Sequence, residues 1–143
     1  MKRVTTLMLL ILIGSVAMIQ CGDDDDGASF LGPGETESAI VGTWIREVVK
    51  GYNYAGLSFL DDGTYYYVNM TSPTSEPYVF REGEYEISGK VLTLGADDAS
   101  CGGDGVYEVS ITEDQKKMTL KKTSDDCEVR AGELPGDWQW AED

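Results

Sequence analysis

Hydrophobic and polar residues alternate with a period of two along much of the chain after Ile40. Tyr85 and Ile87 are separated by acidic or hydroxyl side chains, and residues 106–111 follow the same pattern. Such alternation is typical of antiparallel strands that bury one face and expose the other. Gly, Asp, Ser and Pro, which favour turns, separate these runs. We therefore expect short strands and no helix in this part of the chain.

The runs delimit eight or nine strands in simple succession, followed by Trp138 and Trp140 near the end of the sequence. Asp62-Gly63 and Gly89-Lys90 fit tight hairpin turns. We predict an all-β fold, an antiparallel meander of about eight short strands that closes as a barrel or folds as a sandwich. The expected strands cover residues 41–50, 57–60, 64–70, 78–81, 84–88, 91–94, 106–111, 116–122 and 127–131.

The first 26 residues have a different composition. Lys2 and Arg3 precede an apolar stretch at residues 4–19, and Cys21 comes directly before Gly22 and four Asp. A basic start, an apolar stretch and an abrupt polar boundary form the layout of an export signal. As a membrane-spanning helix the stretch falls short of the roughly 17–25 residues that a bilayer core requires. As a buried helix it would need apolar surroundings on all sides, so cleavage is the better interpretation.

These residues resemble the signal peptide of a bacterial lipoprotein, whose cysteine becomes the lipidated first residue of the mature chain. The resemblance implies fatty acyl chains such as palmitate on Cys21 and attachment to the outer membrane of the cell envelope. The four Asp are similar to an acidic signal for display on the cell surface, or form a solvated spacer. We expect a signal peptide at 1–20, an acidic flexible tether at 21–38 and one folded domain at 39–143.

The charge of the chain narrows the class of partner. The sequence has 11 Lys and Arg, 26 Asp and Glu and no His, for a formal charge of −15. Loss of Lys2 and Arg3 with the signal peptide would bring this to −17. Such a chain repels a phosphate backbone, which argues against nucleic-acid binding. Membrane contact would depend on acyl chains. The charge suits a basic partner protein, although a solvated acidic surface also explains it.

With Cys21 acylated, Cys101 and Cys127 remain as an even pair in an oxidising compartment. A disulfide between them is the simplest interpretation. Its loop of about 26 residues would contribute on the order of 3 kcal/mol in the chain-entropy model. The alternatives are a nucleophilic Cys101 and a metal site. No His is present to activate the thiol, and two Cys with scattered Asp provide too few metal ligands.

Two features of the sequence resemble those of the lipocalin family. In that family, a Gly-x-Trp motif of the first strand packs under an Arg of the last strand. Here the motif is Gly-Thr-Trp at residues 42–44, and Arg130 lies in the last clear strand. The strand–turn–strand at 59–65 and the hairpin at 83–94 extend the resemblance. It implies a lipocalin-like β-barrel in which Trp44 and Arg130 form a structural plug with cation–π character.

The eight tyrosines all fall between Tyr52 and Tyr107. Aromatic residues commonly fill small β cores, and they also line ligand cavities. An eight-stranded barrel is either just filled by its own side chains or holds one small ligand. The candidates for lining such a cavity are Tyr65, Tyr67, Tyr85 and Tyr107.

The sequence contains no recognisable catalytic centre: no His, no Gly-x-Ser-x-Gly and no Gly-rich phosphate loop. The Asp pairs fit turns and do not follow the spacing of a calcium loop. We therefore expect a monomeric envelope protein that is not an enzyme and has no metal or cofactor. It would bind a small apolar ligand inside the barrel. Alternatively, it is a surface protein-binding or inhibitor module that acts on a basic partner through loops 71–77 and 95–104.

Overall fold

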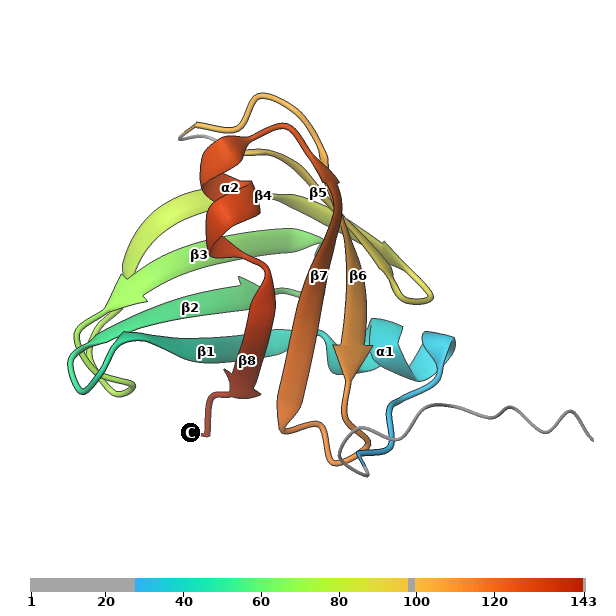
Figure 1. Cartoon of the computed structure of the whole chain (residues 1–143), viewed down its shortest axis with the longest axis horizontal. Coiled ribbons are helices and arrows are strands. Elements are labelled where there is room, and N and C mark those ends of the chain that lie inside the picture. Colours follow the sequence, from blue (N-terminus) through green and yellow to red (C-terminus); the bar gives the residue numbers. More distant parts are fainter. Residues whose placement is uncertain (1–27, 98–99, 143) are drawn as a thin grey trace, which may run out of the picture.

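The computed structural model describes residues 28–97 and 100–142 (Figure 1). The predicted signal peptide and Cys21 lie outside these residues. Eight antiparallel strands form a closed barrel in which each strand pairs with the next and β8 pairs with β1. The prediction of an all-β meander is confirmed. The strands are β1 Gly42–Val49, β2 Asn53–Phe59, β3 Thr64–Met70, β4 Tyr78–Ser88, β5 Val91–Asp97, β6 Gly105–Ile111, β7 Lys117–Asp125 and β8 Gly136–Trp140.

A row of inward side chains crosses the first four strands and explains how the period-two pattern builds the core. Trp44 lies opposite Leu57, Leu57 opposite Tyr67, and Tyr67 opposite Arg81. All four are buried. Because neighbouring strands hold opposite residues about 5 Å apart, the row packs as a continuous layer. The last residue of this row, Arg81, is charged, so the fold must also provide a partner for its buried guanidinium.

Two of the expected hairpin turns are present, and each depends on a glycine with positive φ. Gly63 has φ of 86° between β2 and β3, and Gly89 has φ of 62° between β4 and β5. Glycine adopts this region without the steric cost that a Cβ would add. The local turn chemistry therefore sets the register of both hairpins.

Residues 78–81 and 84–88, expected as two strands, form the single eleven-residue strand β4. A bulge near Phe80 shifts its register with β3, and Gly83 does not interrupt it. The ring of Tyr65 packs so closely on Gly83 that a side chain there would collide with it. Gly83 is thus a site of close approach within a strand and not a turn residue.

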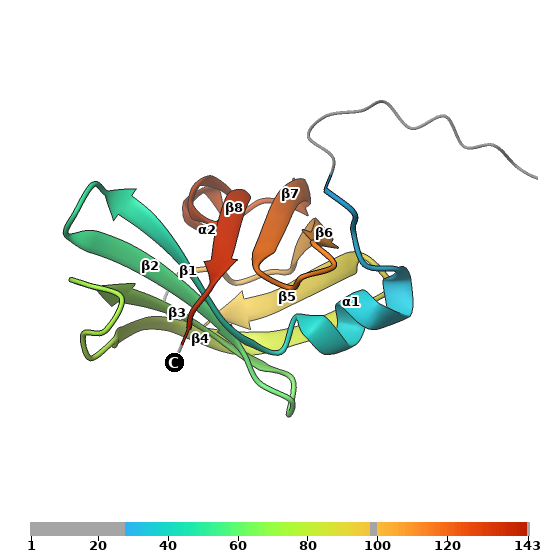
Figure 2. The same cartoon turned by 90° about the horizontal axis from the view of Figure 1, so that it is seen from below.

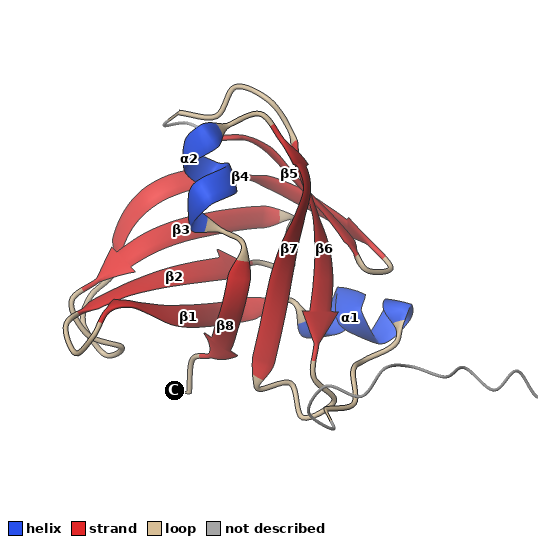
Figure 3. Ribbon diagram, in the orientation of Figure 1, coloured by secondary structure: helices blue, strands red, loops and turns tan. Residues whose placement is uncertain are grey.

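The segment 127–131 was also expected as a strand, but its residues 128–131 belong to helix α2 Glu128–Glu133, which follows Cys127, so this prediction was wrong. Glu, Arg and Ala are good helix formers, and Val129 is the one residue of the helix with a clear strand preference. The last strand is instead β8, which turns Trp138 into the core. Figure 3 shows α2 at the upper end of the barrel and α1 Pro33–Ala39 near the lower end.

All of helix α1 except its last residue lies within the segment 21–38, which we expected to be a flexible tether. Pro33 occupies its first turn, and the Gly32 amide donates a hydrogen bond to the Glu35 carboxylate (2.9 Å). Leu31 and Ala39 are buried against the core. The fold therefore begins before residue 39, because these apolar side chains cover one end of the barrel. Among the described residues, no helix is long and apolar enough to cross a membrane.

Candidate functional site

The tyrosines proposed to line a cavity are packed into the core. Tyr65, Tyr67 and Tyr107 are 1%, 5% and 0% exposed, and Tyr85 packs edge-on against Phe59 with ring centres 4.9 Å apart. The prominent hollows of the described residues lie on the outer surface, and none of them is lined by these four tyrosines. The barrel is filled by its own side chains, as expected for aromatic residues in a small β core.

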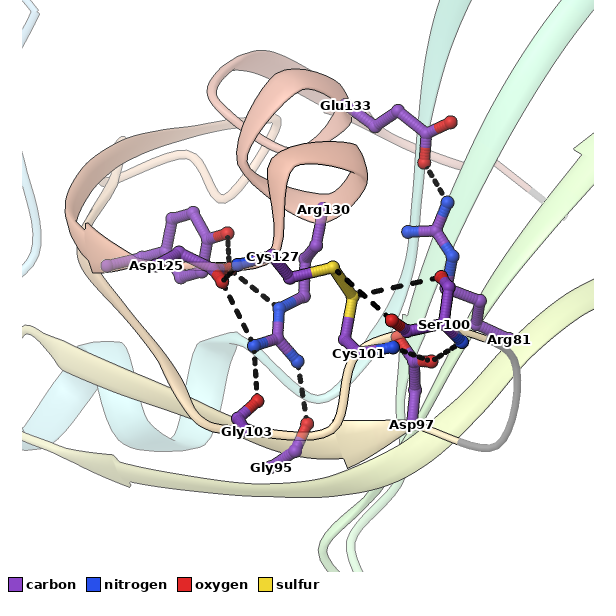
Figure 4. Close-up of polar contacts among 11 residues, drawn as sticks. Arg81, Gly95, Asp97, Ser100, Cys101, Gly103, Asp125, Cys127, Arg130 and Glu133 are labelled. Carbon is purple, nitrogen blue, oxygen red and sulfur yellow. Dashed lines mark hydrogen bonds and ion pairs between the residues drawn. A yellow bond between two sulfur atoms is a disulfide. The ribbon is translucent and has the colours of Figure 1, made fainter.

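The expected stacking of Arg130 on Trp44 is absent, and this prediction was wrong. Trp44 is fully buried in β1, whereas Arg130 lies in α2, where its guanidinium binds other groups (Figure 4). A cation–π contact does occur, but between Arg46 and Trp138, with the guanidinium carbon 4.3 Å from the ring centre. The partners differ because the segment containing Arg130 is a helix and not the last strand.

Trp44 and Trp138 have the same structural role at the two ends of the barrel. The indole N–H of Trp44 donates to the carbonyl of Ile40 (2.9 Å), and that of Trp138 donates to the carbonyl of Leu134 (3.0 Å). Ile40 and Leu134 are the residues at which α1 and α2 end. Each acceptor would otherwise be an unpaired helix carbonyl. The Gly-x-Trp triplet of residues 42–44 recurs in the sequence at residues 136–138, and in both places it follows a helix end and begins a strand.

Arg130 is the centre of a buried polar cluster beneath α2. Its Nε donates to Asp125 Oδ2 (2.6 Å), and its Nη atoms donate to the carbonyls of Gly95 (2.7 Å) and Gly103 (2.6 Å). The Tyr107 hydroxyl donates to the same carboxylate (2.5 Å). The Arg130 and Asp125 side chains are 1% and 0% exposed. A buried ion pair of this kind is stable only when its remaining donors and acceptors are also paired, as they are here.

The electrostatics of this cluster keep the ion pair charged. Burial acts against ionisation of Asp125, but hydrogen bonds from Arg130 and Tyr107 outweigh it and lower the pKa of that carboxyl below its ordinary value. Burial, together with the hydrogen bond to Asp125, raises the pKa of Tyr107. The phenol therefore stays protonated and acts as a donor. These groups are therefore engaged in hydrogen bonds with one another.

The Cys101–Cys127 disulfide predicted from the cysteine count is present. It connects the β5–β6 loop to the residue that precedes α2, beside the Arg130 cluster (Figure 4). Asp97 supports the same loop, because its carboxylate accepts hydrogen bonds from the backbone amides of Ser100 and Cys101. The disulfide and the ion pair therefore hold α2 to the barrel at neighbouring points.

A second buried arginine holds the other side of α2. Arg81 forms an ion pair with Glu133, and its guanidinium lies 5.0 Å from the centre of the Tyr67 ring. Arg46 donates to the backbone carbonyls of Glu133 and Pro135. Neither Arg46 nor Arg81 lies in a recognisable motif, so the sequence did not point to them. Together these arginines close the upper end of the barrel by binding α2.

The loops expected to carry function each border a hollow on the outer surface. Pro73 and Thr74 of the 71–77 loop line a groove of about 870 Å³ together with Trp140. From the segment 95–104, residues 95–97, which belong to the end of β5, and Asp104 border a hollow of about 730 Å³ over β4 and β5. The described side chains of this second hollow include four carboxylates and no Lys or Arg. The four are Glu82, Glu84, Asp97 and Asp104.

The acidic hollow belongs to a larger acidic face. Tyr85 and Ile87 pack against the core, so the alternating residues Glu82, Glu84 and Glu86 point outward. The negative charge of Glu82 also acts on the neighbouring strand β3, where it is the main reason that the pKa of Tyr66 is raised. Within the described residues, no group of three His, Cys, Asp or Glu side chains is placed to hold a metal ion.

Basic side chains are concentrated elsewhere on the barrel. Lys117 and Lys121 are exposed on β7, and Lys116 and Lys122 lie beside them in the sequence. Lys117 forms an ion pair with Asp137 of β8 (2.9 Å). Carboxylates therefore lie over β4 and β5, with Lys90 in the turn between these strands, and the lysines of β7 lie beside Glu108 of β6 and Asp137 of β8.

Comparisons of the chain with models of known families, with curated proteins and with solved structures found no match. The function must therefore be inferred from the chain's own residues.

Proposed function

We propose that this protein is a lipid-anchored, non-enzymatic component of the cell envelope that binds a basic partner protein through the outer surface of its barrel. The sequence left two hypotheses, a small ligand inside the barrel and a basic partner protein on its surface, and one observation favours the second. Tyr65, Tyr67 and Tyr107 fill the interior, and helices lie at both ends, so an internal ligand would have to displace core side chains. Binding at the outer surface requires no such rearrangement.

The acidic outer face of β4 supports a basic partner. Acidic residues cover the outer face of β4, whereas the exposed lysines lie on β7. A patch of one charge attracts a partner of opposite charge, speeds the encounter and orients the docked protein. The net charge of the sequence, −15, also favours a positively charged partner.

The binding proposal can be tested with lysozyme as the basic probe. The full chain, purified in detergent, should bind lysozyme with an affinity that falls as salt rises, and should not bind lysozyme whose lysines are succinylated. The triple variant Glu82→Gln, Glu84→Gln, Glu86→Gln should raise the Kd by about tenfold. Biolayer interferometry measures all of these affinities.

The matched control neutralises three exposed carboxylates that lie away from β4. The control substitutions are Glu113→Gln, Glu128→Gln and Glu142→Gln. This variant should change the Kd by less than about twofold, because only the total charge differs. Equal losses in the two triple variants, or no binding of lysozyme by the full chain, would contradict the proposed site.

The anchor is tested at Cys21. Replacement of Cys21 by Ala removes the thiol proposed to carry the acyl chains, so the chain should move from the membrane fraction to the soluble fraction of an expressing bacterium. Metabolic labelling with palmitate should mark the original chain and not the variant. Unchanged fractionation, with no label on the original chain, would contradict the anchor and leave the binding test unaffected.

A further inference from the structure

The sheet extends beyond the point at which the barrel closes. Strand β4 pairs with β3 from Tyr78 onward, but its pairing with β5 begins only at Gly83. Within the described residues, the segment 78–81 therefore has a strand neighbour on one side only. Figure 2 shows this part of β1–β4 projecting beyond β5–β8. Because an antiparallel strand directs its backbone groups alternately to its two sides, part of the amides and carbonyls of this segment face away from β3.

The side chains on this edge are large and apolar. Tyr78, Val79 and Phe80 are 71%, 49% and 44% exposed. Soluble proteins usually protect such an edge with Lys, with Pro or with a covering loop, because it can pair with another chain. Here Pro77 precedes the edge, and Arg81 is buried in its ion pair with Glu133. The exposed part of the edge is thus apolar and has no basic side chain of its own.

We propose that the partner adds an extended segment to β4 at residues 78–81, in a strand addition that extends the sheet. This inference rests on the proposed function and names how the partner docks. Backbone hydrogen bonds would supply general affinity, and side-chain neighbours would supply selectivity. The partner segment alternates basic and apolar residues, because the edge presents Val79 and Phe80 between the carboxylates of Glu76 and Glu82.

The position of the edge suits a partner protein approaching from outside the membrane. The far end of β4 lies beside α1, where the Gly89 amide donates to the Glu37 carboxylate (2.5 Å). Eleven residues of strand at about 3.3 Å each place Tyr78 roughly 36 Å along β4 from that point. Phe30 pairs with Thr112, so the chain enters the barrel on the α1 side. The edge is therefore far from the place where the anchored segment joins the fold.

The test uses labelled model peptides and the full chain in detergent. A seven-residue peptide alternating Lys and Val should bind, and its counterpart with Pro at the centre should bind at least about tenfold more weakly, because Pro cannot complete the ladder. Fluorescence anisotropy measures both affinities. Hydrogen–deuterium exchange of the segment 78–81 should slow when the alternating peptide is bound, since its outward amides become paired.

The chain offers a closely matched pair of variants. Val79 and Val91 are 49% and 51% exposed, but Val91 lies on β5 with a strand on each side. Val79→Lys places a positive charge on the open edge and should raise the Kd of the alternating peptide by about tenfold. Val91→Lys adds the same charge to a paired strand and should change it by less than about twofold.

Each alternative outcome overturns the strand addition. Equal binding of the two peptides, equal effects of the two variants, or no binding of the alternating peptide would each do so. In each of these three cases, the lysozyme-binding experiment still tests the proposed function independently of the strand addition. A dimer of the full chain that dissociates on Val79→Lys substitution would assign the edge to a second copy instead of a basic partner.

Discussion

Replacement of Asp125 by Ala is expected to lower the free energy of unfolding by about 3–5 kcal/mol, because it leaves a buried guanidinium without its counter-charge. Arg130 is 1% exposed, and Asp125 also accepts the hydrogen bond of Tyr107. The substitution therefore removes the acceptor of the Arg130 Nε, the Tyr107 hydroxyl and the Cys127 amide. Urea denaturation followed by tryptophan fluorescence measures the loss. Asp126→Ala is the matched control, since this neighbouring carboxylate is exposed, and it should stay within about 0.5 kcal/mol.

The same pair predicts a dependence on acid. The pKa of Asp125 is lowered in the folded protein, so its contribution is fully present above the pKa of about 3.9 of an unfolded Asp. It is lost as the pH falls from there through the folded pKa, where the carboxylate takes up its proton. The difference in stability between the original chain and Asp125→Ala should therefore shrink in this range. A difference that is small at neutral pH and constant on acidification would contradict the role of the ion pair.

Replacement of Trp44 by Ala is expected to cost about 3–5 kcal/mol, because it removes a large aromatic side chain from a filled core. Trp44 is fully buried, and its ring meets Trp140 edge-on with centres 5.1 Å apart. Thermal and urea unfolding monitored by circular dichroism measure the change. Tyr52→Ala, at a position 70% exposed, should cost less than about 0.5 kcal/mol.

A second substitution separates packing from hydrogen bonding at the same site. Trp44→Phe keeps most of the aromatic surface but leaves the carbonyl of Ile40 without its indole donor, at a cost of about 1–3 kcal/mol. Equal losses for Trp44→Phe and Trp44→Ala would show that the hydrogen bond, and not the packing, dominates. A nearly neutral Trp44→Ala would remove this residue from the structural core.

The parts of the fold that could be predicted are those that depend on near neighbours in the sequence. The run 64–70 was predicted with its observed bounds, because alternation and the Asp62-Gly63 turn are both local signals. Helix α2 was missed because its six residues are too few to show a helical period. Strand β4 was divided at Gly83 because the ring that occupies the space above it, Tyr65, is far away in the sequence.

The candidate site was predictable only in part. The disulfide followed from the number of cysteines, and the acidic character followed from composition. The partners of Arg130 could not be predicted, because a guanidinium can bind any carboxylate or carbonyl that the fold brings within reach. Its partners are Asp125, Gly95 and Gly103, from segments on both sides of β6.

The sequence by itself determined the strand class, the meander order, the cysteine pair and the excess of acidic residues, because each is a matter of period, turn chemistry or count. Only the tertiary structure decided that the tyrosines fill the barrel, that Arg46, Arg81 and Arg130 hold α2 over its end, and that residues 78–81 of β4 have a single strand neighbour among the described residues. These features depend on which distant side chains meet across the barrel. A period along one strand carries no information about where its neighbour stops.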